Sequence, residues 1–155
     1  MSVPSYIQYE GIPGNVPSGS QQDKCELYEF DHEIRLPTDP RDGTVSGRRQ
    51  HGFFKAVQEP GKQSPLLAKH LCENLEIPSV TVEHFKPDPS SGDLKVYLTH
   101  ELKKVKVVSL QQYKLNTCDP NSKSFRDLEV ACLMYEEYKI KDTEGNEYTD
   151  KWELG

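Results

Sequence analysis

The sequence predicts a mainly β fold, an antiparallel β-barrel or two-sheet sandwich with one short flanking α-helix, in a single domain over residues 1–155. Apolar and polar residues alternate with a period of two over several segments, as in strands that are buried on one face. Clusters of turn-forming residues, such as 87–93 (PDPSSGD), separate these segments. Only one segment, 64–75, has the apolar spacing of an amphipathic helix.

The first clear strand is expected within 25–36, where even positions are apolar and odd positions are mostly charged. The alternation predicts that one side packs on the core: Tyr28, Phe30, Ile34 and Leu36. Pro37 ends the pattern, because proline cannot donate to a strand ladder. Shorter strands are expected at 6–9, 52–58 and 80–85.

A second clear alternation covers 94–103, in which His100 alone interrupts an apolar face of Leu94, Val96, Leu98 and Leu102. In the next strand, 105–110, the pair Val107-Val108 switches the apolar face and indicates a β-bulge. Residues 126–141 fit one long strand, or two strands that meet at a bend. Their expected core face is Leu128, Val130, Cys132, Met134, Tyr138 and Ile140.

The predicted helix begins at Ser64, a plausible N-cap, and carries Pro65 in its first turn, where proline is tolerated. It should end before Pro78. Its apolar stripe is Leu67, Ala68, Leu71, Cys72 and Leu75.

The chain has 155 residues and a formal charge of −6, because 25 Asp and Glu outnumber 19 Lys and Arg. Nucleic acids and anionic membranes bind clustered positive charge, so no nucleic-acid partner and no membrane insertion are expected. No apolar run reaches the roughly 20 residues of a membrane helix. The first residues (MSVPSY) lack the profile of a secretory signal, so synthesis in the cytoplasm without a cleaved signal peptide is expected.

No catalytic, metal-binding or cofactor-binding residues are predicted, and the chain is not expected to be an enzyme. The histidines are not paired at helical spacing, and the common nucleophile, phosphate-loop and dinucleotide motifs are absent. His84 and His100 can be neighbours on two strands, but two ligands do not make a metal site. The four widely spaced cysteines are expected to be reduced and mostly buried: Cys25, Cys72, Cys118 and Cys132.

One connection between predicted strands is longer than a tight hairpin needs. Loops of this length in small domains are either functional or mobile, and the pattern alone leaves both interpretations open. The segment consists of Pro37, Thr38, Asp39, Pro40, Arg41, Asp42, Gly43, Thr44, Val45, Ser46, Gly47, Arg48 and Arg49.

The residues around this connection carry a resemblance. The order of 34–39 (IRLPTD), Gly43, 46–55 (SGRRQHGFFK) and 64–69 (SPLLAK) is similar to the central signature of the haemolysin-coregulated protein (Hcp) family, the tube protein of bacterial type VI secretion systems. The likeness continues through 105–109 (VKVVS) and Tyr135-Glu136 to 145–152 (GNEYTDKW), so it spans most of the chain.

The resemblance implies a β-barrel with a flanking helix that assembles into hexameric rings, and rings that stack into a hollow tube. It further implies a contractile sheath around the tube, a spike protein at its end, effectors carried in the lumen, and secretion through the type VI system without a cleaved signal.

If the chain forms such rings, we expect Pro37 to Arg49 to contact the next ring, because its charged side chains can dock by shape and charge. We expect Tyr97, Leu133 and Tyr135, on the face opposite the predicted core, to lie in subunit contacts. A monomeric barrel that binds a small ligand, and an accessory Hcp-like secreted protein, are the alternatives.

Overall fold

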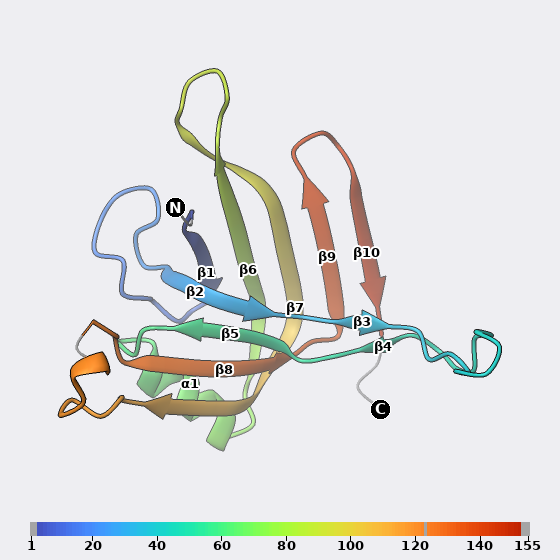
Figure 1. The fold of residues 1–155 in the computed structure, drawn as a ribbon, viewed down its shortest axis with the longest axis horizontal. Helices are drawn as coiled ribbons and strands as arrows, with labels where there is room; N and C mark the ends of the chain where they lie inside the picture. The colour runs from blue at the N-terminus through green and yellow to red at the C-terminus, as the bar shows by residue number, and fades with distance from the viewer. Residues whose placement is uncertain (1–2, 123, 153–155) are drawn as a thin grey trace.

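The computed structural model of the chain describes residues 3–122 and 124–152 and consists mainly of β-strands (Figure 1). One α-helix, α1 (Ser64–Cys72), and one 3₁₀ turn (Pro120–Ser122) accompany the strands in this part of the chain. The strands are β1 (Ser5–Tyr9), β2 (Cys25–Asp31), β3 (Ile34–Arg35), β4 (Gln50–His51), β5 (Phe54–Gln58), β6 (Glu76–Pro87), β7 (Leu94–Tyr113), β8 (Leu128–Met134), β9 (Glu137–Asp142) and β10 (Glu147–Lys151).

Six of the strands close into an antiparallel barrel. The sheet order is β10-β9-β7-β6-β1-β2-β5-β8. An additional pairing of β8 with β7 closes the six strands β7, β6, β1, β2, β5 and β8 into a ring. Strands β9 and β10 extend the sheet beyond β7 as an outer flap (Figure 1). The predicted fold class is therefore confirmed, with the barrel as the correct alternative.

Strand β7 is the element that makes closure possible. Its first half pairs with β6 and β9, and its second half pairs with β8, so one strand of 20 residues belongs to both walls of the barrel. Sequence alternation predicted two strands here, and they are one strand that passes Lys104 at a positive φ of 52°. The predicted bulge is confirmed, because the β7–β8 register shifts between Val107 and Ser109.

The predicted core face of the 126–141 segment is wrong for β8. Glu129, Ala131 and Leu133 point into the barrel and are fully buried, whereas the alternate residues lie half-buried on the outside. The same side continues into Tyr135, which is also fully buried. Leu133 and Tyr135 are therefore core residues and not subunit contacts. Apolar residues occupy both faces of β8, so alternation did not distinguish inside from outside.

The predicted face of β2 needs a similar correction. Cys25 and Leu27 are buried, while Tyr28 is half-buried. The register against β5 shifts between Leu27 and Glu29, and this bulge turns Phe30 toward the aromatic core, where it stacks on Phe54. A bulge changes the inward parity of a strand, which a strict period of two does not anticipate.

Side chains fill the barrel interior, and α1 packs beside it. The helix begins after Gln63, not at an Ser64 cap; Ser64 instead accepts a 3.0 Å hydrogen bond at Oγ from the amide of Gly61. Leu67 is fully buried in the common core, whose largest members include Ile7, Tyr9, Phe54, Ile77, Leu102, Leu133 and Tyr135. Among the described residues, this buried cluster favours a packed core over the enclosed cavity of a ligand-binding barrel.

Candidate functional site

The 34–51 segment, here called the arm, projects from the side of the barrel as a long hairpin (Figure 1). Strands β3 and β4 pair at its base, and an isolated bridge between Thr38 and Val45 pairs its outer part. Its apolar side chains lie in solvent, with Leu36 51% and Val45 58% exposed. The arm carries surface that the chain itself does not cover.

The tip of the arm is an ordered turn. The Asp39 carboxylate accepts a hydrogen bond from the amide of Arg41 at 2.9 Å, and the Asp42 carboxylate accepts two from Thr44 at 3.0 and 2.8 Å. These bonds lower the pKa of Asp42. Gly43 supplies the positive φ of 74° that the turn requires. Between the two open interpretations of this loop, the hydrogen bonds favour a built element over a mobile one.

The base of the arm is fixed to β10. Arg49 donates from Nη2 to Asp150 Oδ1 at 2.8 Å and to the carbonyl of Lys151 at 3.1 Å. His51 approaches the other oxygen of Asp150 at 2.7 Å. The Arg49 hydrogen bond and charge, with the contact from His51, lower the pKa of Asp150, so the carboxylate stays ionised and holds both partners.

A hydrogen-bonded chain continues from this anchor into the core. Tyr135 OH lies 2.7 Å from His51 Nδ1 and 2.7 Å from His32 Nε2. In the tautomer whose Nε2–H donates to Asp150, His51 accepts at Nδ1 from Tyr135 OH, and Tyr135 OH accepts from His32 Nε2–H. Burial raises the pKa of Tyr135 well above its ordinary value, so the hydroxyl stays protonated and acts as a connector.

Two further histidines complete an aromatic cluster at this end of the barrel. His84 Nε2 lies 3.1 Å from His100 Nδ1, which confirms that the two are neighbours, and His84 Nδ1 lies 3.0 Å from Ser5 Oγ. Phe30 and Phe54 pack against them. Burial lowers the pKa of His32 and of His100 to about 4, with neighbouring histidines acting in the same direction. We call His32, His51, His84 and His100 the histidine cluster.

The histidine cluster packs against the aromatic rings of Phe30, Phe54 and Tyr138. Within residues 3–122 and 124–152, no group of three or more His, Cys, Asp or Glu side chains is arranged to hold a metal ion. The cysteines in this part of the chain are free, and the expectation of mostly buried thiols holds only in part. Cys25 is buried, which raises its pKa to about 12, and Cys132 is half-buried, whereas Cys72 and Cys118 are exposed.

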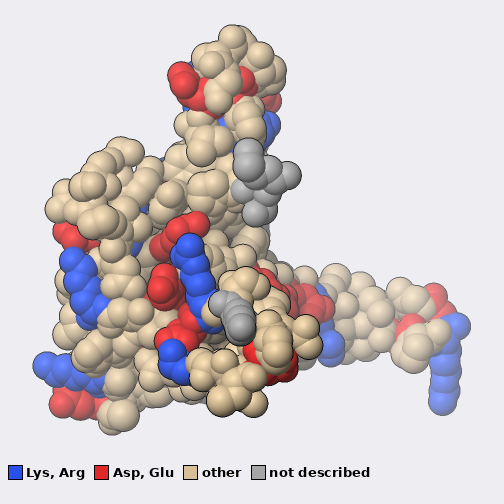
Figure 2. Space-filling model, turned by 60° about the vertical axis from the view of Figure 1, so that its left-hand side comes forward, with Lys and Arg blue, Asp and Glu red and all other residues tan. Residues whose placement is uncertain are grey.

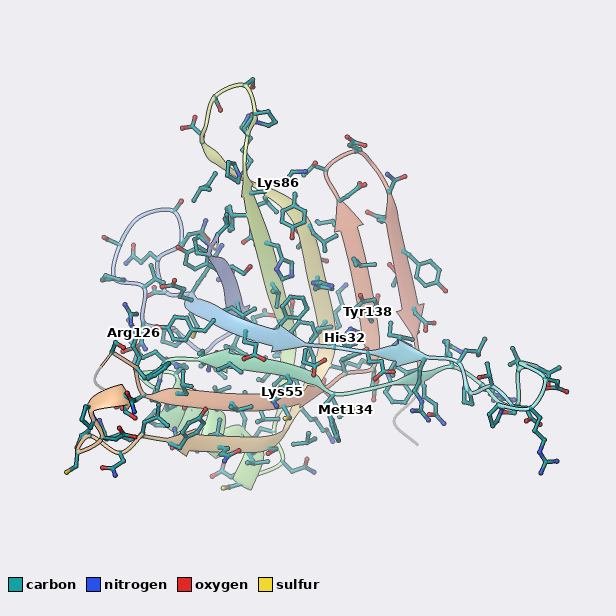
Figure 3. All side chains as sticks on the ribbon, in the orientation of Figure 1. His32, Lys55, Lys86, Arg126, Met134 and Tyr138 are labelled. Carbon is teal, nitrogen blue, oxygen red and sulfur yellow. The ribbon has the colours of Figure 1, made fainter. Side chains whose placement is uncertain are left out.

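A second unpartnered surface lies on the outside of β8. Its members, here called the β8 outer face, alternate with the core residues of the strand: Leu128, Val130, Cys132 and Met134. Lys55 on β5 pairs beside Cys132, and Figure 3 labels Lys55 and Met134 on these neighbouring strands. Val108, at the β7 bulge, adds an apolar side chain that is 42% exposed. Of the three predicted contact residues, only Tyr97, 39% exposed, remains available to a partner.

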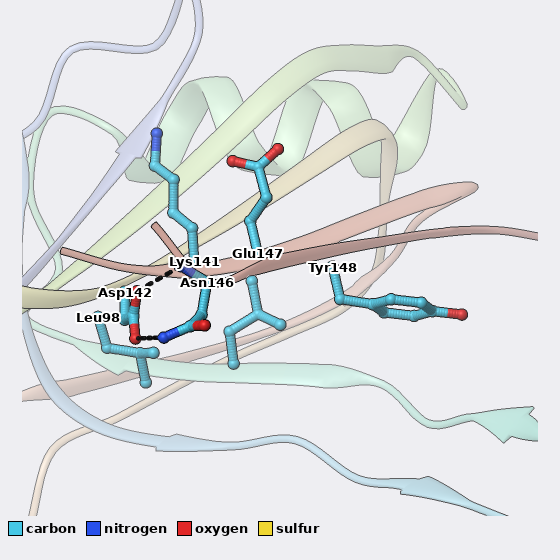
Figure 4. A pocket seen from close by; sticks show the side chains of 7 residues that line it. Leu98, Lys141, Asp142, Asn146, Glu147 and Tyr148 are labelled. Atoms are coloured by element: carbon cyan, nitrogen blue, oxygen red, sulfur yellow. Dashed lines mark hydrogen bonds between the residues drawn. The ribbon is translucent and has the colours of Figure 1, made fainter. Parts of the chain in front are cut away.

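A shallow groove lies where the β9–β10 flap meets the first half of β7 (Figure 4). Leu98, Ile140 and the 64% exposed Tyr148 form its apolar part. At the end of the groove, the Asp142 carboxylate accepts hydrogen bonds from the backbone N–H of Asn146 at 2.9 Å and from Asn146 Nδ2 at 2.8 Å. These bonds close the β9–β10 turn. Asp142 and Asn146, two of the polar residues of the groove, therefore serve the turn.

Sequence reasoning found the arm but not its anchor. Arg49, just before β4, and His51, in β4, are two residues apart in extended chain and so face the same side, which is a usable signal for a shared partner. Nothing in the sequence identifies that partner as Asp150, about a hundred positions later.

The described residues contain no helix with the length and apolarity needed to cross a membrane.

The comparisons with known proteins agree with this architecture. Residues 6–141 match the family described as "Type VI secretion system effector, Hcp". The chain is 26% identical to the "Major exported protein" of Pseudomonas aeruginosa, an alignment that covers 98% of this chain and 96% of the relative.

Solved structures are similar over the same extent. A crystal structure of an Hcp protein has a TM-score of 0.88 at 23% identity and covers 98% of this chain and 99% of that one. An Hcp1 protein from E. coli EAEC 042 has a TM-score of 0.83 at 25% identity, with 97% and 99% covered. The family consists of secreted structural proteins, which agrees with the expectation that the chain is not an enzyme. Because the family model matches most of the chain, residues 6–141, the chain belongs to the Hcp family of the type VI secretion system.

Proposed function

We propose that the chain is a structural tube subunit of a bacterial type VI secretion system. Six copies form a ring, rings stack into a hollow tube, and a contractile sheath expels the tube with its spike protein and the effectors in its lumen. The subunit is made in the cytoplasm, leaves through the system without a cleaved signal, and uses no cofactor. The observation that carries the proposal is the family match over residues 6–141, together with an ordered arm whose outer part leaves Leu36 and Val45 exposed to solvent.

Two kinds of contact are needed for such a tube. A ring of identical subunits closes through head-to-tail contacts, and stacking adds a second interface that repeats without closing. The β8 outer face and Tyr97 supply apolar surface for the ring contact. The arm, which extends far beyond the barrel, supplies the stacking contact, and its ordered tip lowers the entropy lost on docking.

The assembly is tested with purified protein. We expect light scattering after size-exclusion chromatography to give six times the subunit mass, and electron micrographs of concentrated protein to show rings and filaments. Deleting 38–46 and closing the gap with glycines should leave the rings and the thermal unfolding transition intact while filaments disappear. A stable monomer at high concentration would contradict the tube, and an unfolded deletion variant would contradict the arm as a separate element.

A further inference from the structure

A small pocket lies at the opposite end of the barrel from the arm. It is formed where the 14–17 loop lies against the outside of β1 and β2. The aromatic and acidic side chains of its lining are Tyr6, Glu26, Tyr28 and Glu59. We call it the acidic pocket. Two tyrosine rings and two carboxylates form its walls, a combination that favours a cation with a flat apolar face.

The acidic pocket keeps an excess of negative charge. Glu59 accepts a hydrogen bond from Tyr28 OH at 3.0 Å and lies 3.7 Å from the guanidinium of Arg126. Glu26 makes no ion pair within the described residues, so two carboxylates face one arginine. Burial and the negative charge of Glu26 raise the pKa of the neighbouring Tyr6.

Arg126 shows which ligand chemistry the rim accepts. Its guanidinium lies over the Tyr28 ring, 5.8 Å from the centroid, and donates to Tyr28 OH at 2.8 Å. It lies beside the pocket, next to the lining residues Tyr28 and Glu59, and Figure 3 labels it. A second guanidinium on the side of Glu26 and Tyr6 would meet the same pairing of ring and carboxylate.

The tip of the arm presents such a group. Arg41 makes no ion pair within the described residues, and the two neighbouring carboxylates, Asp39 and Asp42, are committed to backbone amides of the tip turn. Figure 2 brings the end with the acidic pocket forward and shows a basic side chain at the far end of the arm. The turn therefore holds a free arginine at the point of the chain farthest from its own barrel.

We propose that Arg41 of one copy binds in the acidic pocket of a second copy, between Glu26 and Tyr6. The two surfaces lie at opposite ends of the molecule (Figure 1), so the contact is head-to-tail and repeats from copy to copy. This inference rests on the proposed self-assembly. It identifies the acidic pocket as the surface that receives the arm when rings stack.

The charge pair is tested by exchange. We expect R41E alone and E26R alone to reduce stacking several-fold, measured by sedimentation velocity and filament counts, and the double variant to recover most of the loss. R48E is the matched control, because Arg48 is an exposed arginine of the same arm. An equal loss in R48E would overturn the specific role of Arg41, as would unchanged stacking in R41E. Light scattering on every variant checks that rings persist.

A cross-linking experiment tests the geometry without removing either charge. In a background with Cys72→Ser and Cys118→Ser, Pro40→Cys beside Arg41 and Pro17→Cys at the acidic pocket are made as separate proteins. A short bismaleimide should join the two only when they are mixed, and far more than Pro40→Cys mixed with Ser91→Cys at the β6–β7 turn. Equal products in both mixtures overturn the pairing. Wild-type protein that neither forms rings nor stacks would instead contradict the proposed function, so the two failures are distinct.

Discussion

Asp150 on β10 holds the base of the arm through Arg49, with 2.8 Å between Asp150 Oδ1 and Arg49 Nη2. The same carboxylate receives His51, which leads through Tyr135 to His32. The direction in which the arm leaves the barrel is thus set by the last described strand. The arm, which we propose contacts another copy, therefore depends on a residue about a hundred positions away from it.

We expect Asp150→Asn to loosen the arm without unfolding the barrel. The amide cannot hold Arg49 and His51 together as a carboxylate does, because it carries no charge and one side of it donates. Trypsin should cleave at Arg41 and Arg48 several-fold faster, and stacking should weaken. The melting temperature should fall by only a few degrees, because the pair to Arg49 is exposed.

Asp42→Asn is the control for this variant. It makes the same chemical change at the tip of the arm, where the Asn oxygen can still accept from Thr44. Its cleavage rate should stay close to that of the wild type. If Asp150→Asn behaves in the same way, Asp150 does not position the arm.

Glu129 is a buried carboxylate that three glutamine amides satisfy. Gln58 donates to it at 2.8 Å, Gln63 at 3.3 Å and Gln112 at 2.5 Å, and Tyr9 continues the network from Gln58. Glu129→Ala removes the acceptor of Gln58 and Gln112 and one of the two acceptors of Gln63, and it opens a cavity in the core. We therefore expect a loss of about 3 kcal/mol or more of unfolding free energy in urea.

Glu101, a partly exposed carboxylate on β7, is the control for the Glu129 variant. It meets Lys141 at 3.1 Å and Lys139 at 4.0 Å in partly exposed pairs. Glu101→Ala should cost less than about 1 kcal/mol. Equal losses in the two variants would show that the amide network around Glu129 adds nothing beyond an ordinary surface pair.

The alternation of residues predicted most strands and the bulge at Val107, because burial on one face leaves a period of two in the sequence. It chose the wrong side of β8 for a physical reason. The inward side contains Glu129, whose acceptors are satisfied by Gln58, Gln63 and Gln112 from other elements. A pattern that counts charge as exposure assigns such a residue to the solvent.

The arm was recognisable from its length and composition, but its partners were not. Arg49, beside β4, and Asp150, on β10, are brought together by the topology of the barrel and its flap. The acidic pocket likewise combines Tyr6, Glu26 and Glu59 from three separate segments. Contacts of this kind depend on topology, and a single sequence carries no periodic signal for them.

The histidine cluster predicts that the fold loses stability in mild acid. His32 and His100 bind protons in the unfolded chain below about pH 6.5, but in the folded chain only below about pH 4. Between these values the unfolded state holds more protons, so the free energy of unfolding falls as the pH falls. For His100, 4% exposed, the stability present at neutral pH and lost by pH 4 is about 3 kcal/mol.

Urea unfolding at a series of pH values between 7.5 and 4 measures this loss. His100→Phe should flatten the dependence, because an aromatic ring fits among Phe30, Phe54 and Tyr138 without taking up a proton. His70→Gln, on α1, is the comparison variant that removes a histidine outside the histidine cluster. The pKa of Asp150 is already below its ordinary value, so its own titration lies under this window. An unaltered slope in His100→Phe would contradict the assignment.

Neighbouring residues of β8 provide a matched test of the two faces of the barrel wall. Ala131 is fully buried and faces the core, whereas Val130 belongs to the β8 outer face. Ala131→Glu places an unpaired charge in a filled interior, so we expect the subunit not to fold. Val130→Glu places the same side chain outside, so circular dichroism should show a folded subunit while light scattering shows a mass below that of the ring. A ring of full mass would exclude the β8 outer face from the subunit contact, because an apolar interface does not accept a row of unpaired carboxylates.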